Sequence, residues 1–427
     1  MKLTQYERLD EAVYRQTLPC GLQILVVPKA GFSRKTAYLI TDFGSIHQSF
    51  TLDGQHYDTP TGVAHYLEHK VFDMPGRDIM EEFSVLGAGV NAFTSYDLTA
   101  YYFSATENFE DSLRLLLEFV TTPYFTEESV EKERGIIDQE IGMYWDDPNS
   151  RVFDNLMAAL YHHHPIRVPI LGTQESIRQI TAQTLHLCHR AFYVPSNMVL
   201  CVVGDISPEG VCRIASDVLG TERRSCGIKD PIPKEPESCR EQTVSVSMDI
   251  PMPTFYLGFK CPPTGLGLES ARREMVADLA AEVLFGESSS LYLKMYESGL
   301  IDSSFGGGYE TTDEGAILSC GGDSDEPEAV RDEILAQARI LARDGITEAD
   351  FQRLKRSAIG RRIRDLDSFS ATCFRLGANV CDDFDYFRFP EVYETITAED
   401  IRVFLDENIH THNCSISIIT PCKEDEL

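Results

Sequence analysis

The residues in this sequence with the clearest capacity for chemistry lie in one short segment, His65-Tyr66-Leu67-Glu68-His69. Residues four apart lie on the same face of a helix, one turn apart, so the imidazoles of His65 and His69 can bind a single ion. Imidazole nitrogen is a common ligand of zinc. Glu68 would project near the same face, where its carboxylate can accept a proton from a water bound to that ion. This segment therefore predicts a zinc site with its own base.

The order of these residues is informative but not sufficient by itself. H-x-x-E-H reverses H-E-x-x-H and is the signature of the inverzincins, a group of zinc peptidases. The chain contains 11 histidines, and chance would produce about two such matches per hundred chains of this kind. Two solvated histidines on a helix face are the alternative at this point.

A second predicted helix, at residues 128–144, offers the remaining groups. A catalytic zinc usually has three protein ligands and one open position for water. Glu133 and Glu140 stand seven residues apart and so share one face, two turns apart. Glu140 can supply the third ligand, and Glu133 can accept a hydrogen bond from a ligand imidazole and fix its tautomer. The alternative is that both glutamates serve solubility, as they often do on charged helices.

Turn signals and periodicity predict the elements that would position these residues. Pro60-Thr61-Gly62 introduces a helix that begins near Val63, and Asp146-Asp147-Pro148 ends the helix at 128–144. A further helix is predicted at 111–120. Strands are predicted at 22–27, 36–41, 90–95 and 100–105, the last two antiparallel.

One passage occurs twice without a gap. Thr181 opens a helical stretch that reaches Asn197 sixteen residues later, just before an apolar strand. Thr397 opens another that reaches Asn413 at the same spacing, again just before a strand. A duplicated α+β unit of roughly two hundred residues explains this pattern better than chance does.

A proline-rich and charged segment separates the two copies. Residues 224–242 read RSCGIKDPIPKEPESCREQ and show no apolar period, which is typical of a linker. The predicted organisation is a zinc-bearing N-terminal domain at 1–225, a linker at 226–242 and a C-terminal domain without metal at 243–427.

Composition limits the expected partners. Of 427 residues, 38 are basic and 68 are acidic, which gives a net charge of −30. Such a field repels nucleic-acid phosphates and anionic lipid, so we expect neither nucleic acid nor a membrane as a partner. The same field would attract cationic peptides, although solubility alone also explains the charge.

The sequence also predicts a cytoplasmic location. No apolar signal segment follows Met1, and no apolar run is long enough to span a bilayer. The 12 cysteines are scattered without a C-x-x-C pair. This distribution is typical of free thiols in a reducing compartment, packed as small apolar residues.

Several segments together resemble peptidase family M16, the pitrilysin and insulinase group that includes mitochondrial processing peptidase. Glu140 follows His69 by 71 residues, close to the separation that the family uses for its third ligand. The resemblance covers the whole chain and is most specific in its first half. The matching segments are 62–69 (GVAHYLEH), 91–94 (NAFT), 133–140 (ERGIIDQE), 164–173 and 195–198.

The resemblance implies a fold and a mode of substrate binding. It implies an α+β fold of two homologous domains, each an antiparallel sheet flanked by helices, which form half of a clamshell around a peptide chamber. One zinc per chain would be held by His65, His69 and Glu140, with Glu68 as the base. A peptide would add to a sheet edge near the zinc as an extra strand. By the family's pattern this edge strand carries Asn91, Ala92, Phe93 and Thr94.

The second half departs from the family's pattern. Members place an Arg and a Tyr seven positions apart to stabilise the oxyanion, beginning in a strand that corresponds to 315–321. Here that strand reads GAILSCG, and no Arg of the second half has a Tyr seven residues later. Arg361 occupies the position that corresponds to Glu140 in the repeat. We therefore expect a companion M16-like chain that supplies the missing donors, and a homodimer is less favoured.

Two classes of function remain open at the level of sequence. The first is an active metallopeptidase, which the presence of all ligands and the base favours. The second is a non-catalytic member of the family that acts as a scaffold or a peptide-binding subunit.

Overall fold

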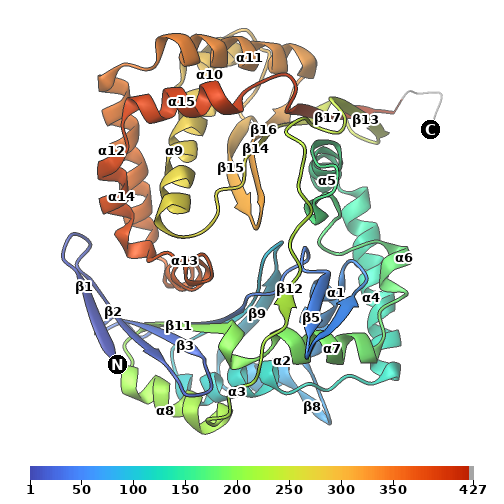
Figure 1. The fold of residues 1–427 in the computed structure, drawn as a ribbon, viewed down its shortest axis with the longest axis vertical. Coiled ribbons are helices and arrows are strands. Elements are labelled where there is room, and N and C mark those ends of the chain that lie inside the picture. Colours follow the sequence, from blue (N-terminus) through green and yellow to red (C-terminus); the bar gives the residue numbers. More distant parts are fainter. Residues whose placement is uncertain (423–427) are drawn as a thin grey trace. The chain divides into compact units, whose positions relative to one another are not determined.

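The computed structural model describes residues 1–422, which divide into two compact units (Figure 1). Neither unit is continuous in sequence. Unit 1 consists of 1–141, 170–231 and 361–390, and unit 2 consists of 142–169, 232–360 and 391–422.

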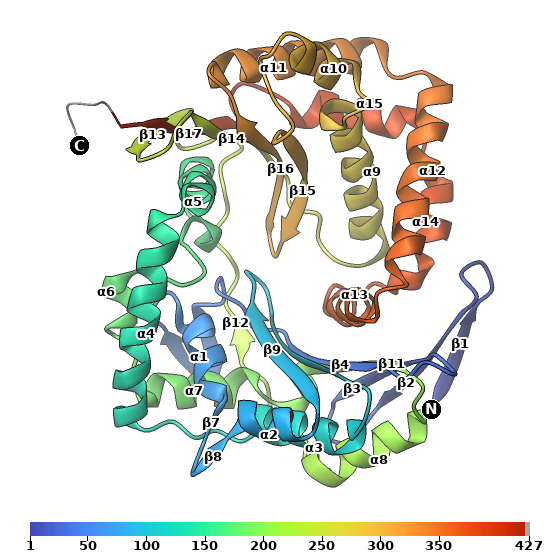
Figure 2. The ribbon, with the colours of Figure 1, turned by 180° about the vertical axis from the view of Figure 1, so that it is seen from behind.

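Unit 1 is built on a mixed sheet of seven strands in the described chain, and only β3 and β11 run parallel. Strand β11 is buried along its whole length, as expected for a strand covered on both faces. Strand β9, labelled in Figure 2, ends the order. It pairs with β10. The order is β1 (Lys2–Tyr6), β2 (Glu11–Thr17), β3 (Gln23–Pro28), β11 (Met198–Gly204), β4 (Lys35–Thr41), β10 (Thr99–Ala105) and β9 (Ala88–Thr94).

Helices cover both faces of this sheet. Helices α3 (Phe109–Thr121) and α8 (Pro208–Leu219) pack against one face, and Figures 1 and 2 show α13 (Phe369–Cys381) on the other. Helix α13 approaches β4 and β11 closely because it carries Gly377, where a Cβ atom would lie 2.6 Å from a side-chain carbon of Ile40.

Unit 2 is built on a second sheet, whose five described strands are antiparallel except for the pair β13 and β17. Helix α5 (Pro148–Leu160) packs on β14 and β17, whereas α9 (Gly267–Phe285) packs on β15 and β16. The order is β13 (Thr243–Met248), β17 (Cys414–Pro421), β14 (Thr254–Cys261), β16 (Gly315–Asp323) and β15 (Gly306–Thr312).

Other α-helices and strands complete the described structure. They are α1 (Val63–Val71), α2 (Ile79–Val85), α4 (Glu127–Asp146), α6 (Gln174–Ile177), α7 (Ala182–Phe192), α10 (Ser290–Glu297), α11 (Pro327–Asp344), α12 (Glu348–Asp365), α14 (Phe389–Thr395), α15 (Ala398–Asn408), β5 (Ser49–Leu52), β6 (Gln55–Asp58), β7 (Asp73–Met74), β8 (Arg77–Asp78) and β12 (Ile228–Lys229).

The predicted α+β class and the predicted repeat are both confirmed. Thr181 and Thr397 are the N-caps of α7 and α15, and each side chain accepts a hydrogen bond from a backbone N–H three residues later. Each helix leads to an interior strand of a sheet, β11 in one unit and β17 in the other. The predicted strands and helices of the first half also match the observed ones within a few residues.

The two copies exchange one helix each. Helix α5 belongs to the first half of the sequence but packs on the sheet of unit 2, and α13 belongs to the second half but packs on the sheet of unit 1. The domains 1–225 and 243–427 therefore stay a prediction about the sequence repeat, and the compact units differ from them at these helices.

Two expectations from composition can be compared with the structure. All 12 cysteines are free, and nine of them are buried, which confirms that they pack as small apolar residues. Among the described residues, no helix is both long and apolar enough to cross a membrane.

One carboxyl group of unit 2 lies in an unfavourable setting. Asp154 is on α5, and burial raises its pKa to about 6, although the charge of Arg151 opposes the shift. The carboxyl of an Asp in an unfolded chain has a pKa near 4. As pH rises, the unfolded chain therefore loses this proton at a lower pH than the folded chain does. The free energy of unfolding therefore falls as pH rises from about 4 to 6, by up to about 3 kcal/mol.

We predict that Asp154→Asn raises the melting temperature at pH 7.5, because the amide removes the cost of an ionised buried group. The gain should be much smaller at pH 4.5, where the folded protein already carries the proton. Thermal unfolding at both pH values measures the effect, and Asp406→Asn on the exposed side of α15 is the control. An equal gain at both pH values would contradict the assignment.

Candidate metal centre

Helix α1 carries the H-x-x-E-H residues into the interior of unit 1. It begins after Gly62, whose φ of 87° and position suit only glycine, because a Cβ atom would lie 2.4 Å from the carbonyl oxygen of Leu171. His65 and Glu68 are buried together with the helix's apolar residues. Buried polar groups need partners, so the elements around α1 must supply them.

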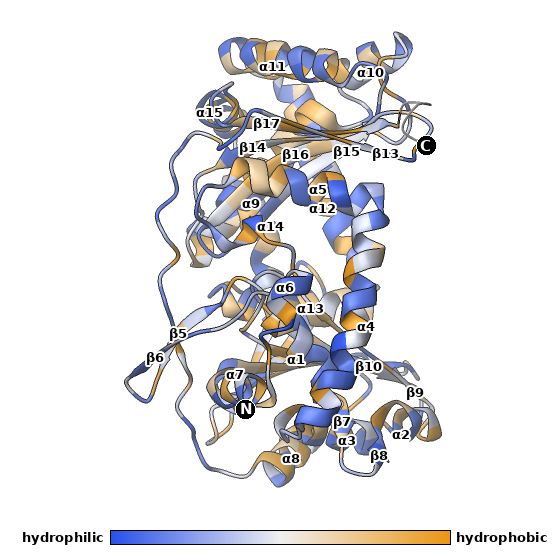
Figure 3. Cartoon of the chain, turned by 90° about the vertical axis from the view of Figure 1, so that its right-hand side faces the viewer, coloured by the Kyte–Doolittle hydropathy of each residue, from blue (hydrophilic) through white to orange (hydrophobic). Residues whose placement is uncertain are grey.

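Helix α4 lies against α1 and brings the acidic residues. Val130 and Ile137 are buried in the core of unit 1, although hydrophilic residues cover most of α4 (Figure 3). The hydroxyl of Tyr66 donates a hydrogen bond to the carbonyl oxygen of Val130, at 2.5 Å. These contacts fix the rotation of α4, and they turn Glu133 and Glu140 toward the two histidines.

The predicted ligands come together. Glu140 Oε2 lies 3.7 Å from His65 Nε2 and 3.6 Å from His69 Nε2. One ligand atom from each of the three residues lies within 4.8 Å of the other two. Zinc bonds of about 2.0–2.1 Å in a tetrahedron place ligand atoms about 3.4 Å apart. The three side chains therefore fit a zinc ion with little adjustment.

Glu133 fixes the orientation of one candidate ligand, His69. His69 Nδ1 donates a hydrogen bond to Glu133 Oε1, at 3.0 Å. With the proton on Nδ1, Nε2 keeps a lone pair for the metal. The same bond lowers the pKa of Glu133. This is the role that the spacing of Glu133 and Glu140 predicts.

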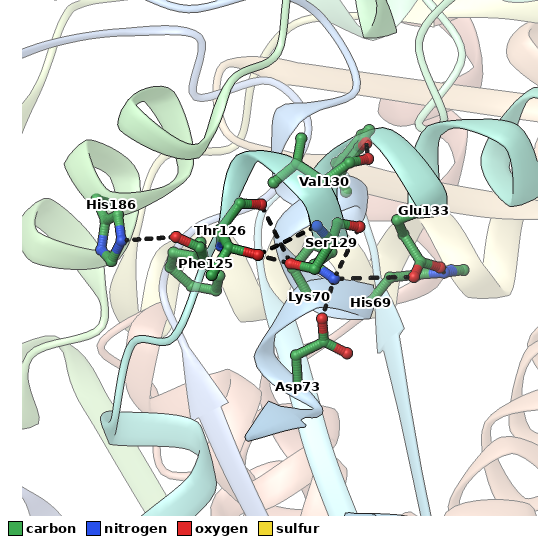
Figure 4. Close-up of polar contacts among 10 residues, drawn as sticks. His69, Lys70, Asp73, Phe125, Thr126, Ser129, Val130, Glu133 and His186 are labelled. Atoms are coloured by element: carbon green, nitrogen blue, oxygen red, sulfur yellow. Dashed lines mark hydrogen bonds and ion pairs between the residues drawn. The ribbon is translucent and has the colours of Figure 1, made fainter. Parts of the chain in front are cut away.

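Lys70 is part of the centre and was not predicted from sequence. Its side chain is 1% exposed. Its ammonium group pairs with Asp73, donates to the carbonyl oxygen of Ser129 at 3.2 Å, and lies 4.0 Å from Glu133 Oε2 (Figure 4). Lys70 thus connects the two ligand-bearing helices. The only sequence signal is its position directly after His69.

Glu68 lies beside the ligands as predicted for a base. Its Oε2 accepts a hydrogen bond from the Thr94 hydroxyl at 2.6 Å. Burial raises the pKa of Glu68, while the bond from Thr94 and the charge of His69 oppose the rise. The carboxylate is therefore poorly solvated and held by one oxygen, as suits a proton acceptor.

Burial also sets the charge of the ligands. Burial lowers the pKa of His65 to about 3, and the charge of His69 adds to the shift. Burial lowers the pKa of His69 as well, but Glu133 outweighs it with help from Glu140 and Glu68, so the net shift is upward. Burial raises the pKa of Glu140. The His65 ring is therefore neutral at physiological pH, which is the form that a metal ligand needs.

The predicted substrate strand is β9. Asn91, Ala92, Phe93 and Thr94 all lie on it, and none of the four is fully buried. Phe93 packs against Phe374 of α13, with ring centroids 5.4 Å apart. Of the four, Thr94 donates a hydrogen bond to a residue of the centre, Glu68. The expected oxyanion strand, 315–321, is β16, and it carries neither Arg nor Tyr.

This fold and this site define a class of protein, and comparison with known sequences identifies it. The insulinase domain of peptidase family M16 matches residues 52–174, and the peptidase M16 inactive domain matches residues 179–358. The chain belongs to peptidase family M16, which confirms the predicted family.

Individual relatives agree with this assignment. The chain is 35% identical to the zinc protease YmfH of Bacillus subtilis, over 99% of both proteins. An M16-like peptidase from Alicyclobacillus acidocaldarius has a TM-score of 0.93 at 30% identity, over 96% of this chain and 99% of that one. A peptidase M16 inactive domain from Pseudomonas fluorescens shares the fold, with a TM-score of 0.80 at 18% identity. The match covers 96% of this chain and 98% of that one.

We predict that His65→Ala, His69→Ala and Glu140→Ala each remove bound zinc, because each deletes one of three ligands. Glu133→Ala should weaken zinc by about 10- to 100-fold, since it frees the His69 ring. Metal analysis and competitive chelation measure both effects. His56→Ala, at an exposed histidine elsewhere in unit 1, should bind zinc normally. Full zinc occupancy in His69→Ala would sink the assignment.

We also predict that Lys70→Met weakens zinc by up to roughly 10-fold, because Glu133 loses a neighbouring positive charge and α4 loses a tether. Zinc affinity by competitive chelation is the measurement. Lys29→Met removes another half-buried ion pair of unit 1, with Glu11, and controls for a general loss of stability. Unchanged zinc affinity in Lys70→Met would show that Lys70 serves folding alone.

Proposed function

We propose that this chain is a zinc metalloendopeptidase. The observation that carries the proposal is the buried Glu68 carboxylate beside three side chains that fit zinc. Thr94 holds its Oε2, and no described residue donates a hydrogen bond to its Oε1. A purely structural metal site would be closed by a fourth protein ligand and would need no base. The names of the zinc protease relatives support the same function.

Different residues would perform different steps of peptide hydrolysis. When bound, zinc supplies a Lewis acid that polarises the scissile carbonyl and acidifies a water. Glu68 accepts the proton of the attacking water and returns one to the leaving amine. Strand β9 offers its unpaired edge to an extended peptide, whose backbone would pair with it. The site would thus cleave within peptides or short unfolded segments.

The proposal also includes a companion chain, an enclosed chamber and a preference for cationic peptides. The second half lacks the Arg and Tyr donors, and loss of one oxyanion donor typically costs about 10²–10³ in rate. We therefore propose a heterodimer in which a companion M16-like chain supplies these donors and completes an enclosed chamber. The net charge of −30 favours cationic peptides. A cytoplasmic location stays a prediction.

The second candidate is a non-catalytic scaffold or peptide-binding subunit. It rests on the match of residues 179–358 to the M16 inactive domain. That match lies mainly in the second copy, away from His65, Glu68 and Glu140. It therefore describes the half that lacks the metal residues and leaves the first proposal favoured.

The test is digestion of matched basic and acidic peptides by the zinc-loaded chain, at low and high salt. The chain is assayed alone and with a companion M16-like subunit, and mass in solution is measured alongside. We expect turnover that needs the companion, favours basic peptides and loses this preference in salt. Glu68→Gln should keep zinc and lose most turnover.

Each result addresses a separate part of the proposal. Robust turnover by the chain alone would refute the heterodimer but support the peptidase. Equal rates for both peptides at all salt concentrations would assign the charge to solubility. Zinc binding and peptide binding without turnover under any pairing would favour the non-catalytic subunit.

A further inference from the structure

The hydroxyl of Thr94 holds the carboxylate that would act as the base. Thr94 is the last residue of β9 and lies opposite Thr99 of β10. Its Oγ1 lies 2.6 Å from Glu68 Oε2, a short distance for a hydroxyl and a carboxylate. Hydrogen bonds to an ionised acceptor are about twice as strong as neutral ones. This contact therefore connects the candidate substrate strand directly to the candidate base.

The direction of this hydrogen bond follows from the neighbouring groups. An ionised carboxylate accepts only, so the Thr94 hydroxyl must donate its proton to Glu68. Thr99 donates its own proton to the carbonyl oxygen of Phe43, at 2.9 Å, and its oxygen lies 3.4 Å from that of Thr94. Thr99 is fully buried. It therefore does not compete for the carboxylate, and the Thr94 proton has one strong acceptor.

The carboxylate has few other means of keeping its place. Glu68 is buried, and the bond from Thr94 is the hydrogen bond that the described residues give it. A glutamate side chain has three rotatable bonds, and a carboxylate without a partner would turn toward any donor that becomes available. When Thr94 fixes Oε2, Oε1 of Glu68 remains as the proton acceptor, and its lone pairs point in a defined direction.

We propose that Thr94 is the positioning residue for Glu68, and that it transmits the placement of β9 to the base. This inference rests on the proposed peptidase function. A peptide that pairs with β9 would lie along the same strand that ends at Thr94. Docking of the substrate backbone and alignment of the base would then share one structural element. Because Thr94 donates to Glu68 and not to a ligand, it should affect the base without affecting the metal.

The experiment compares Thr94→Val, which replaces the hydroxyl with a methyl group, with Thr94→Ser, which keeps the hydroxyl. We expect Thr94→Val to lower kcat by about 10- to 100-fold, with KM and zinc affinity within about twofold of the wild-type values. Thr94→Ser should restore kcat to within about threefold. Thr94→Ala should match Thr94→Val, and serves if the valine variant is unstable.

A matched control separates positioning from a loss of stability. Thr36 is a buried threonine on β4 of the same sheet, and its hydroxyl shares a hydrogen bond with Ser104 at 2.9 Å. Thr36→Val should lower the melting temperature without lowering kcat. In a Glu68→Gln background, Thr94→Val should cause no further loss of turnover, because the base that it positions is already gone.

A binding measurement tests the inference without turnover. A peptide hydroxamate chelates zinc and places an acidic proton beside the base, so its affinity reports the alignment of Glu68. Its Kd should rise by a similar factor in Thr94→Val and in Glu68→Gln, and should stay unchanged in Thr36→Val and Thr94→Ser. If the wild-type chain shows no turnover, the proposed function fails, and this measurement still decides the role of Thr94.

Three results would overturn the inference. The first is wild-type kcat, or wild-type hydroxamate affinity, in Thr94→Val. The second is an equal loss of turnover from Thr94→Val in the wild-type and Glu68→Gln backgrounds. The third is a loss of zinc in Thr94→Val, which would place Thr94 in the support of the metal instead of the base.

Discussion

The cost of burying polar side chains on α1 is the constraint on which the rest of the centre depends. His65 and Glu68 are buried, and Lys70 is almost fully enclosed. An unpaired buried charge is strongly destabilising, so each group needs a partner in a specific place. Thr94 on β9 provides this partner for Glu68, and Asp73 together with Ser129 in the first turn of α4 provides it for Lys70, whereas Glu140 lies 3.7 Å from Nε2 of the neutral His65 ring. The elements around α1 are therefore arranged by its polar groups as much as by its apolar ones.

Apolar packing and metal binding then act on the same geometry. Tyr66 and Leu67 are fully buried in the core of unit 1, which fixes the rotation of α1 and points the histidines toward α4. Bringing three candidate ligands from two helices together costs free energy when no ion is bound, because the buried side chains lose solvation. Burial raises the pKa of Glu140 and lowers that of His65 for this reason. A bound cation would offset that cost, so folding and metal affinity should be coupled.

Sequence could predict the parts of this site that depend on local periodicity. The helical spacings of His65 to His69 and of Glu133 to Glu140 place side chains on one face whatever surrounds the helix, and the structure brings both pairs together. Contacts between distant segments were not predictable in this way. The bond from Thr94 to Glu68, the tether from Lys70 to α4 and the exchange of α5 and α13 depend on the packing of elements far apart in the chain. No periodic pattern in the sequence predicts these contacts.

The second copy shows that the fold does not require these polar groups. In the order of elements, α9 precedes α10, β15 and β16 as α1 precedes α2, β9 and β10. The buried residues of α9 are apolar throughout, whereas those of α1 include His65, Glu68 and Lys70. On α12, Arg361 stands where α4 carries Glu140. Since the corresponding helix α9 buries apolar residues alone in the same kind of sheet-and-helix unit, stability alone does not explain the polar groups that α1 buries. The proposed chemical role accounts for them, because a metal and a base act more strongly where solvent screening is low and their partners are fixed.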